Sequence, residues 1–392
     1  MNQCRKNTLI LSIAQALLLV NNITLISING LLGFALAADK RLATLPVMTY
    51  VIGAALSTIA ASSFMKHYGR RAGFTVGSLF AVVGVSLGAV AVLMQNFWLL
   101  CAATLVSGVY NAFGKYYRFA AADTGPADFK STAISLVLAG GIVGGVLGPE
   151  ASKITRDLTH VPFFATYIAL ILFALFSLAV VRFLDIPQPS EKEKTAKGRP
   201  LHQIMRQPTF IVAVLSAAVG YGVMNLMMSA TPLAMDVCGL PFNDAALVLQ
   251  CHVIGMYAPS FFTGSLIKRF GVLKILIAGL VLMFACVGVA LSGTTFSHFW
   301  WSLAILGVAW NFLYIGGTTL LTESYDPAEK AAVQGINDFL IFGTTSISAL
   351  ASGIVITSRG WASLATISLP LLGITMAAVL SLAIKRRFVV AS

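Results

Sequence analysis

The stretch Ser62 to Gly73, SSFMKHYGRRAG, is a short basic run punctuated by glycine, and a long apolar segment lies on each side of it. About two hundred residues later, Gly264 to Lys274, GSLIKRFGVLK, repeats the pattern. Two pairs of residues match at an offset of 202: Lys66 with Lys268, and Gly69 with Gly271. An apolar segment, a basic turn and a second apolar segment therefore occur twice, which is typical of chains built from two similar halves.

The composition indicates a membrane protein. The 392 residues are 58% hydrophobic and only 10% charged, with a mean hydropathy of +0.87. This leaves too little polar surface to cover a water-soluble globule of that size. The net charge of +12 comes from short basic runs between apolar segments rather than from one basic face. The lipid bilayer is therefore the expected partner, and nucleic acid is not.

Runs with few or no charges are long enough for twelve transmembrane helices of about 20 residues each. We predict an all-α integral membrane protein with two pseudo-symmetric six-helix bundles, a twofold repeat that is characteristic of secondary transporters. The predicted spans are 8–36, 42–65, 72–94, 98–122, 131–153, 161–184, 209–235, 245–267, 275–295, 299–322, 332–357 and 361–384.

The polar run DIPQPSEKEKTAKGRPLHQIMRQ at 185–207 predicts a linker between the halves. The predicted domains are 1–184, a cytoplasmic linker at 185–208, and 209–392. If both termini are cytoplasmic, nineteen of the 26 Lys and Arg residues lie inside. The five outside are Lys40, Arg41, Lys153, Arg156 and Arg359, and the other two, Lys115 and Arg118, lie within the span predicted at 98–122. The positive-inside rule thus predicts cytoplasmic termini, in a bacterial inner membrane.

These features together resemble the major facilitator superfamily over nearly the whole chain. Its loop signature, Gly-x-Leu-Ala-Asp-Arg-x-Gly-Arg-Arg, is partly kept by Gly69, Arg70 and Arg71 in one turn and by Gly264, Leu266, Arg269 and Gly271 in the other. Both copies carry lysine at the acidic position, which in the family helps to latch the halves on the cytoplasmic side. Asp123 and Glu323 are the expected substitutes. The resemblance therefore implies a cytoplasmic gate made of Lys66, Arg70, Asp123, Lys268, Arg269 and Glu323.

Two further stretches refine this resemblance. Gly144-x-x-x-Gly148-Pro149 is similar to the family's antiporter signature, although the Gly-Gly that follows it there is missing here. Small residues that allow close helix packing give the same pattern. The segments YRFAAADT (117–124) and GMYAPSFFTGSLIKRFGVLK (255–274) are similar to a bacterial branch of the superfamily with members described as riboflavin carriers.

In this fold the first, fourth, seventh and tenth spans line the substrate cavity, and an asparagine lies near the middle of each. The predicted substrate-binding residues are Gln15, Asn22, Asn111, Lys115, Arg118, Tyr221, Asn225, Asn311 and Tyr314. Buried amides must be paired or hydrated. The asparagines are therefore either cavity residues or hydrogen bonds between packed helices. Lys115 and Arg118 either attract an anionic group or extend to the cytoplasmic headgroups.

Proton coupling needs a titratable group inside a span, and Glu150, Asp338 and His252 are the candidates. Each has a structural alternative: an ion pair of Glu150 with Lys153, a hydrogen bond from a neighbouring helix to Asp338, or simple packing of His252. The first span lacks an embedded acid, so uncoupled diffusion or exchange of an organic anion stays an alternative.

The predicted function is alternating-access transport of a small polar or aromatic organic solute, as symport or antiport with protons, by a monomer. A membrane-embedded enzyme or a non-transporting receptor or scaffold is the alternative of another class. No cluster of nucleophiles or acids in the sequence favours an enzyme. The five cysteines lack CxxC spacing, and we expect neither a metal nor a cofactor.

Overall fold

The computed structural model describes residues 2–39, 42, 45–188 and 198–391, and this part of the chain is helical, without strands. Lys40, Arg41 and residues 189–197 of the predicted linker lie outside the described residues. Eleven of the described helical segments are long and apolar enough to cross a membrane. A further apolar segment, 242–270, is interrupted at Ala258 and Pro259. The fold is that of an all-α membrane protein with the expected spans.

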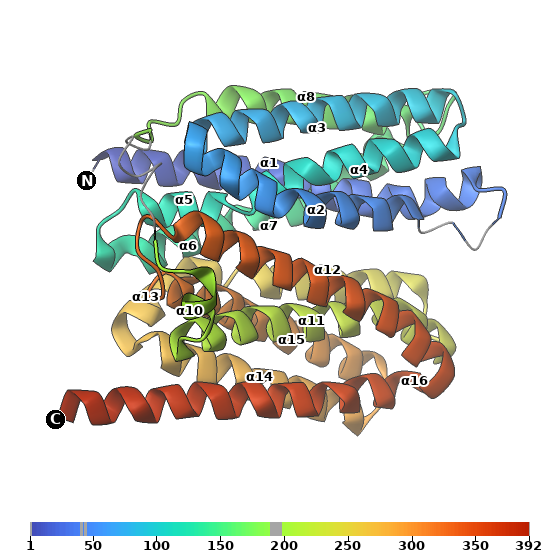
Figure 1. Cartoon of the computed structure of the whole chain (residues 1–392). Helices are drawn as coiled ribbons and strands as arrows, with labels where there is room; N and C mark the ends of the chain where they lie inside the picture. Colours follow the sequence, from blue (N-terminus) through green and yellow to red (C-terminus); the bar gives the residue numbers. More distant parts are fainter. Residues whose placement is uncertain (1, 40–41, 43–44, 189–197, 392) are drawn as a thin grey trace. The chain divides into compact units, whose positions relative to one another are not determined.

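The helices group into two compact units (Figure 1). Unit 1 comprises Met1–Pro126, Leu136–Lys197 and Lys330–Phe339, and unit 2 comprises Ala127–Ser135, Gly198–Glu329 and Leu340–Ser392. Each unit thus contains a short segment from the other half of the chain. The division of the domains at 185–208 stays a prediction.

Unit 1 is a bundle in which α1 packs against α7 and α8, while α4 packs against α2 and α3. Glycine permits the closest approach: a Cβ on Gly53 of α2 would meet the carbonyl oxygen of Leu105, and one on Gly108 of α4 would meet that of Tyr50. The helices are α1 (Asn2–Leu36), α2 (Leu45–Tyr68), α3 (Arg70–Leu93), α4 (Phe97–Gly114), α5 (Tyr117–Asp123), α6 (Lys130–Ala139), α7 (Gly141–Thr155) and α8 (Phe164–Val181). The first residues of α6 belong to unit 2, as does the short 3₁₀ helix η2 (Ala127–Phe129).

Unit 2 is built around α15, which packs against α11, α12 and α14. Its helices are α10 (Leu201–Met205), α11 (Pro208–Val237), α12 (Phe242–Tyr257), α13 (Ser260–Phe270), α14 (Val272–Ser292), α15 (Phe296–Leu321) and most of α16 (Lys330–Ala391). The first residues of α16, Lys330–Phe339, belong to unit 1. The long α16 is interrupted at Gly360, where φ is 77°. This break separates the two last spans, as the sequence predicts.

The two basic turns have the same backbone conformation. Gly69, between α2 and α3, has φ 87°, and Gly271, between α13 and α14, has φ 89°. Glycine adopts this region without the steric penalty of a Cβ. The repeated glycine is therefore the residue that allows each chain reversal.

Three predicted spans differ in detail. The span predicted at 98–122 is divided into α4 and α5 by a turn at Lys115 and Tyr116, and the one at 131–153 into α6 and α7 at Gly140. The span predicted at 245–267 breaks at Pro259, because proline has no N–H to donate to the preceding turn.

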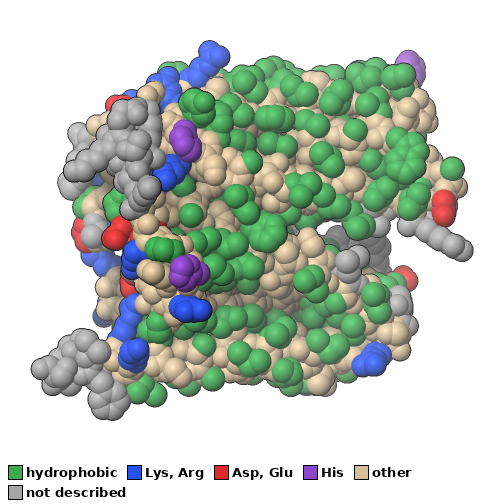
Figure 2. Space-filling view, in the orientation of Figure 1, with side chains coloured by type: hydrophobic (Ala, Val, Ile, Leu, Met, Phe, Trp, Pro, Cys, Tyr) green, Lys and Arg blue, Asp and Glu red, His purple; other side chains and the backbone are tan. Residues whose placement is uncertain are grey.

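The surface agrees with burial in lipid. Figure 2 shows hydrophobic side chains along the flanks of the helices in each unit, whereas most Lys and Arg side chains on this face gather near one end of the helices. Leu56 and Leu172 in unit 1, and Ile347 in unit 2, are between 63% and 71% exposed. Such residues suit contact with acyl chains rather than with water.

Candidate functional site

An aromatic cluster made of Tyr221, Tyr257, Trp310 and Tyr314 lies within unit 2. Trp310 and Tyr314 of α15 stack at 4.8 Å between ring centroids. Tyr221 of α11 meets both rings edge-on at 5.3 Å, and Tyr257 of α12 meets Trp310 at 5.7 Å. Trp310 and Tyr314 are buried, whereas Tyr221 is partly exposed. Tyr257 is buried as well, so three helices bring four aromatic side chains together, of which Tyr221 is the partly exposed one.

The two amides predicted in unit 2 are both hydrogen-bonded. Asn225 donates to the Thr345 carbonyl oxygen at 3.2 Å and to Ser348 Oγ at 3.0 Å. Asn311 donates to the Met256 carbonyl oxygen and to Ser260 Oγ, and accepts from Thr263 Oγ1, all within 2.7 Å. The amide of Asn311 therefore joins α15 to α12 and α13. A role for either residue in solute binding stays a prediction.

The three amides predicted in unit 1 lie on α1 and α4, which are in contact. Gln15 is buried, and Asn22 is partly buried. Asn111 is 5% exposed. The Oδ1 atoms of Asn22 and Asn111 have no hydrogen-bond partner among the described residues. Because a buried acceptor without a partner is unfavourable, these two oxygens are candidates for contact with a bound solute or with water.

A buried ion pair joins α5 to the start of α16 within unit 1. Arg118 Nη2 donates to Asp338 Oδ1, and the side chains are only 2% and 3% exposed. Asn337 donates to the same Oδ1 at 2.8 Å, and the Arg118 guanidinium lies 4.6 Å from the centre of the Phe119 ring. Lys115 is close enough to act on Asp338 electrostatically. Arg118 is therefore a buried charge with a counter-ion and does not reach the headgroups.

The other two coupling candidates have different surroundings. Glu150 is exposed on α7. His252 on α12 is fully buried, with Nδ1 2.8 Å from the Leu303 carbonyl oxygen and with Nε2 lacking a partner among the described residues. Only Asp338 combines burial with a charged partner.

The predicted gate residues fall into separate contacts. In unit 1, Arg70 donates to Asp123 at 2.9 Å and to Gln334 at 2.6 Å, while Lys330 lies 3.6 Å from Asp123. Lys66, at the end of α2, is partly buried. Asp123 thus meets the first basic turn, and its role in gating stays a prediction.

In unit 2 the second acid has a different partner from the expected one. Glu323 pairs with Arg386 at 2.9 Å rather than with the basic turn. In that turn, Lys268 lies 3.3 Å from Asp128, and Arg269 lies over the ring of Phe270. The two copies of the repeat therefore use different acids.

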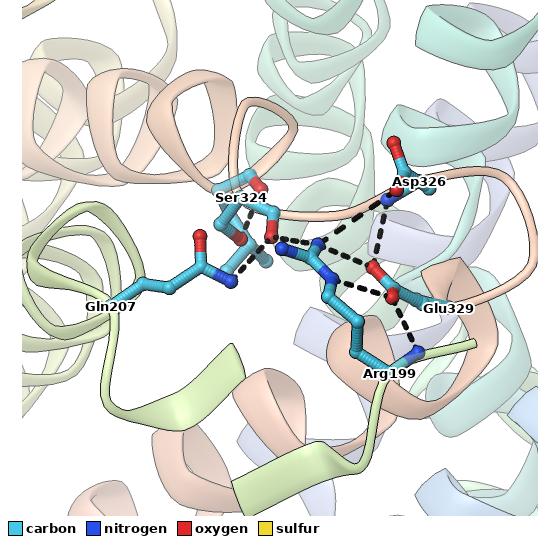
Figure 3. Close-up of polar contacts among 6 residues, drawn as sticks. Arg199, Gln207, Ser324, Asp326 and Glu329 are labelled. Atoms are coloured by element: carbon cyan, nitrogen blue, oxygen red, sulfur yellow. Dashed lines mark hydrogen bonds and ion pairs between the residues drawn. The ribbon is translucent and has the colours of Figure 1, made fainter. Parts of the chain in front are cut away.

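The end of the linker is anchored in unit 2 by a contact that the sequence did not reveal (Figure 3). Glu329 accepts hydrogen bonds from the backbone N–H, Nε and Nη2 of Arg199, at 2.6 to 2.8 Å, and from the backbone N–H of Asp326 at 3.0 Å. Gln207 and Arg199 both donate to the Ser324 carbonyl oxygen at 3.3 Å. The hydrogen bonds from Arg199 lower the pKa of Glu329 to about 2, against the opposing effect of burial.

Comparison with known sequences settles the family. A sequence profile described as the Major Facilitator Superfamily matches residues 11–337. This chain belongs to the major facilitator superfamily. It is therefore a multi-pass membrane transporter and not an enzyme.

Two relatives show where the chain lies within the superfamily. The riboflavin transporter RfnT of Brucella anthropi is 38% identical over 375 residues, which cover 95% of this chain and 94% of that protein. The uncharacterized MFS-type transporter YddS of Bacillus subtilis is 26% identical over 354 residues, 86% of this chain and 81% of that protein. The resemblance to a branch with riboflavin carriers is thereby confirmed.

Solved structures support the fold. The human organic anion transporter MFSD10 has a TM-score of 0.79 at 14% identity, covering 96% of this chain and 99% of that one. A bacterial homologue of the iron transporter ferroportin, in an outward-facing state, has a TM-score of 0.76 at 14% identity, covering 96% and 98%. At these identities the likeness shows the fold alone.

Several residues of the described sites were not predicted, among them Tyr257, Gln334 and Glu329. Tyr257 directly precedes the break in the span predicted at 245–267. An aromatic residue next to Ala258-Pro259 is a local feature of the sequence from which Tyr257 could have been predicted as a site residue. Gln334 and Glu329 lie far from their partners in sequence, and no local pattern indicates those contacts. Their pairing depends on the tertiary fold.

Proposed function

We propose that this chain carries riboflavin, or another flavin with the same ring system, across a bacterial inner membrane. The observation that carries the proposal is the 38% identity to a riboflavin transporter over nearly the full length of both chains. The aromatic cluster of Tyr221, Tyr257, Trp310 and Tyr314 supports it, because stacking on aromatic rings suits a flat, polar heterocycle. Transport proceeds by alternating access in a monomer with cytoplasmic termini.

Counterflow of labelled riboflavin in proteoliposomes tests this proposal without assuming a direction of transport. We expect exchange by the wild type and at least a tenfold lower rate for Trp310→Ala, because truncating a central aromatic residue in a binding site typically costs more than 2 kcal/mol. Trp301→Ala is the matched control, since Trp301 lies in the second turn of the same helix and is 56% exposed. Wild-type protein that shows no riboflavin counterflow would refute the proposal.

We also propose that transport is coupled to protons at Asp338. This carboxylate is buried, has Arg118 on Oδ1 and has no partner on Oδ2 among the described residues, so a proton can bind there when Arg118 moves away. A pH gradient should then accelerate riboflavin uptake by the wild type. The double variant Arg118→Gln/Asp338→Asn, which keeps the site neutral, should retain counterflow and lose the response to the gradient. An unchanged response would exclude Asp338 and favour uncoupled transport.

A further inference from the structure

The guanidinium of Arg118 has two partners of different kinds within unit 1. Its Nη2 donates to Asp338 Oδ1, and its central carbon lies 4.6 Å from the centre of the Phe119 ring. Phe119 follows Arg118 directly in α5, and consecutive residues of a helix point about 100° apart. The contact is therefore not a consequence of adjacency in the chain, since the Arg118 side chain has to place its charged end over the ring.

The Phe119 ring is held in place by its neighbour Tyr116. The two ring centres lie 6.1 Å apart, and the Tyr116 hydroxyl donates to the Thr58 carbonyl oxygen of α2 at 3.1 Å. Both aromatic side chains are 0% exposed. Because side chains in a protein interior are closely packed, neither ring can turn away without disturbing its neighbours. The ring is thus a preformed partner of the guanidinium, whatever the charge of Asp338.

The two carboxylate oxygens of Asp338 have different surroundings. Oδ1 accepts from Arg118 and, at 2.8 Å, from Asn337 Nδ2, whereas Oδ2 is buried without a partner among the described residues. In the proton step proposed above, a proton from water binds to Oδ2, and Oδ1 keeps the hydrogen bond from Asn337. The carboxylate becomes a neutral acid, so the net charge of the pair rises by one unit. That charge belongs to Arg118, which is 1% exposed.

A buried cation that loses its counter-ion is unfavourable unless another group stabilises it. The other charged and titratable neighbours of the pair do not replace the carboxylate. Lys115 has the same charge as Arg118, and Asp123 is bound to Arg70 at 2.9 Å. Tyr116 uses its hydroxyl on α2. The face of an aromatic ring attracts a cation, and this attraction is full only when no carboxylate neutralises the charge.

We propose that Phe119 is a positioning residue for proton coupling: its ring holds the Arg118 guanidinium within unit 1 while Asp338 is protonated. The cation then stays beside the acid and forms the ion pair again when the proton leaves. The inference rests on the proposed coupling at Asp338, and it does not depend on the identity of the solute.

Infrared titration of the purified full-length chain follows the proton on Asp338 directly, because a protonated carboxyl group has a C=O band that a carboxylate lacks. The double variant Arg118→Gln/Asp338→Asn identifies the band by its loss. Phe119→Met removes the ring and keeps a large apolar side chain. It should move the midpoint of the band by about 0.4–1.5 pH units toward acid, because the protonated state loses the cation–π contact. Phe119→Tyr keeps the ring and should keep the wild-type midpoint.

Phe74→Met is the matched control. Phe74 is also 0% exposed in unit 1, and its ring packs against Tyr117 at 4.7 Å between centres. This change should lower the melting temperature and leave the midpoint unchanged, which is also what a purely structural role of Phe119 would give in Phe119→Met. Phe119→Leu is a second variant without the ring, and it should show the same acid shift if Phe119→Met does not fold.

The outcomes separate this inference from the proposed function. An equal midpoint with and without the ring, or a shift toward alkaline pH, would overturn the role of Phe119 and leave coupling at Asp338 intact. If the double variant lost no band, Asp338 would bind no proton, and both the coupling and the role of Phe119 would be overturned. An acid shift confined to the variants without the ring would uphold the role, even for a protein that does not carry riboflavin.

Discussion

Arg118 and Asp338 are a pair of opposite charges that can be removed together more easily than singly. Both are buried in unit 1, so Asp338→Asn leaves the guanidinium without its counter-ion. We expect this single change to destabilise the protein by about 3–5 kcal/mol. The double variant Arg118→Gln/Asp338→Asn should recover most of that loss, because it leaves no buried charge.

Thermal unfolding of the three proteins in detergent measures this difference. Glu323→Gln provides the control, since its pair with Arg386 is 38% to 43% exposed and should contribute no more than about 1 kcal/mol. If the double variant were as unstable as the single variant, the loss of stability would not come from a buried charge that lacks its counter-ion.

The low pKa of Glu329 predicts that its contact with Arg199, which anchors the end of the linker, depends on pH. Its pKa is lowered from an ordinary value of 4.5 to about 2, so the stabilisation is fully present above about pH 4.5 and is lost as the pH falls toward 2. Glu329→Gln should lower stability at pH 7 by about 1.5–3 kcal/mol, the range for hydrogen bonds to charged groups. The difference from wild type, followed by thermal unfolding between pH 7 and pH 3, should shrink only below about pH 4.5. A difference that already declines near pH 6 would contradict the assignment to this carboxylate.

At the level of elements, the turn between α13 and α14 depends on Gly271. Its φ of 89° lies in the region that disfavours side chains, although nothing lies within 4 Å of a Cβ built there. Gly271→Ala should therefore destabilise the protein through backbone strain alone, by about 1–2 kcal/mol. Gly288→Ala, inside α14 and equally open, should be neutral or slightly stabilising, because alanine is the better helix former. Equal melting temperatures of the two variants would argue against a strained turn.

The elements also show how far the sequence could predict this structure. Span positions follow from charge-free runs, and the breaks at Gly69, Gly271 and Gly360 follow from glycine beside charge, because both are local properties. The helix-breaking effect of Pro259 is also a local property, yet we predicted a single helix that includes this residue.

The candidate site was predictable only in part. Tyr221, Asn311, Arg118 and Asp338 could each be named from their place within a span, but the contacts they make could not. Arg118 and Asp338 are 220 residues apart, and Tyr221 meets Trp310 across two helices. Whether a buried amide bonds a neighbouring helix, as Asn311 does, depends on packing that no local pattern encodes.

For the molecule as a whole, the distribution of Lys and Arg predicts the orientation in the membrane, and the cysteines offer a direct test of it. Cys238 follows α11, at the end of the helix away from the linker, and is exposed. With cytoplasmic termini it should face outward, so a membrane-impermeant maleimide should label it in intact cells, and Cys238→Ser should abolish that labelling. His202→Cys on α10, placed in a Cys4→Ser/Cys238→Ser background, should react only after permeabilisation, because α10 follows the linker. If residue 202 were labelled in intact cells and residue 238 only after permeabilisation, the orientation would be opposite to the predicted one. The basic turns at Gly69 and Gly271 would then lie on the outer side, against the positive-inside rule.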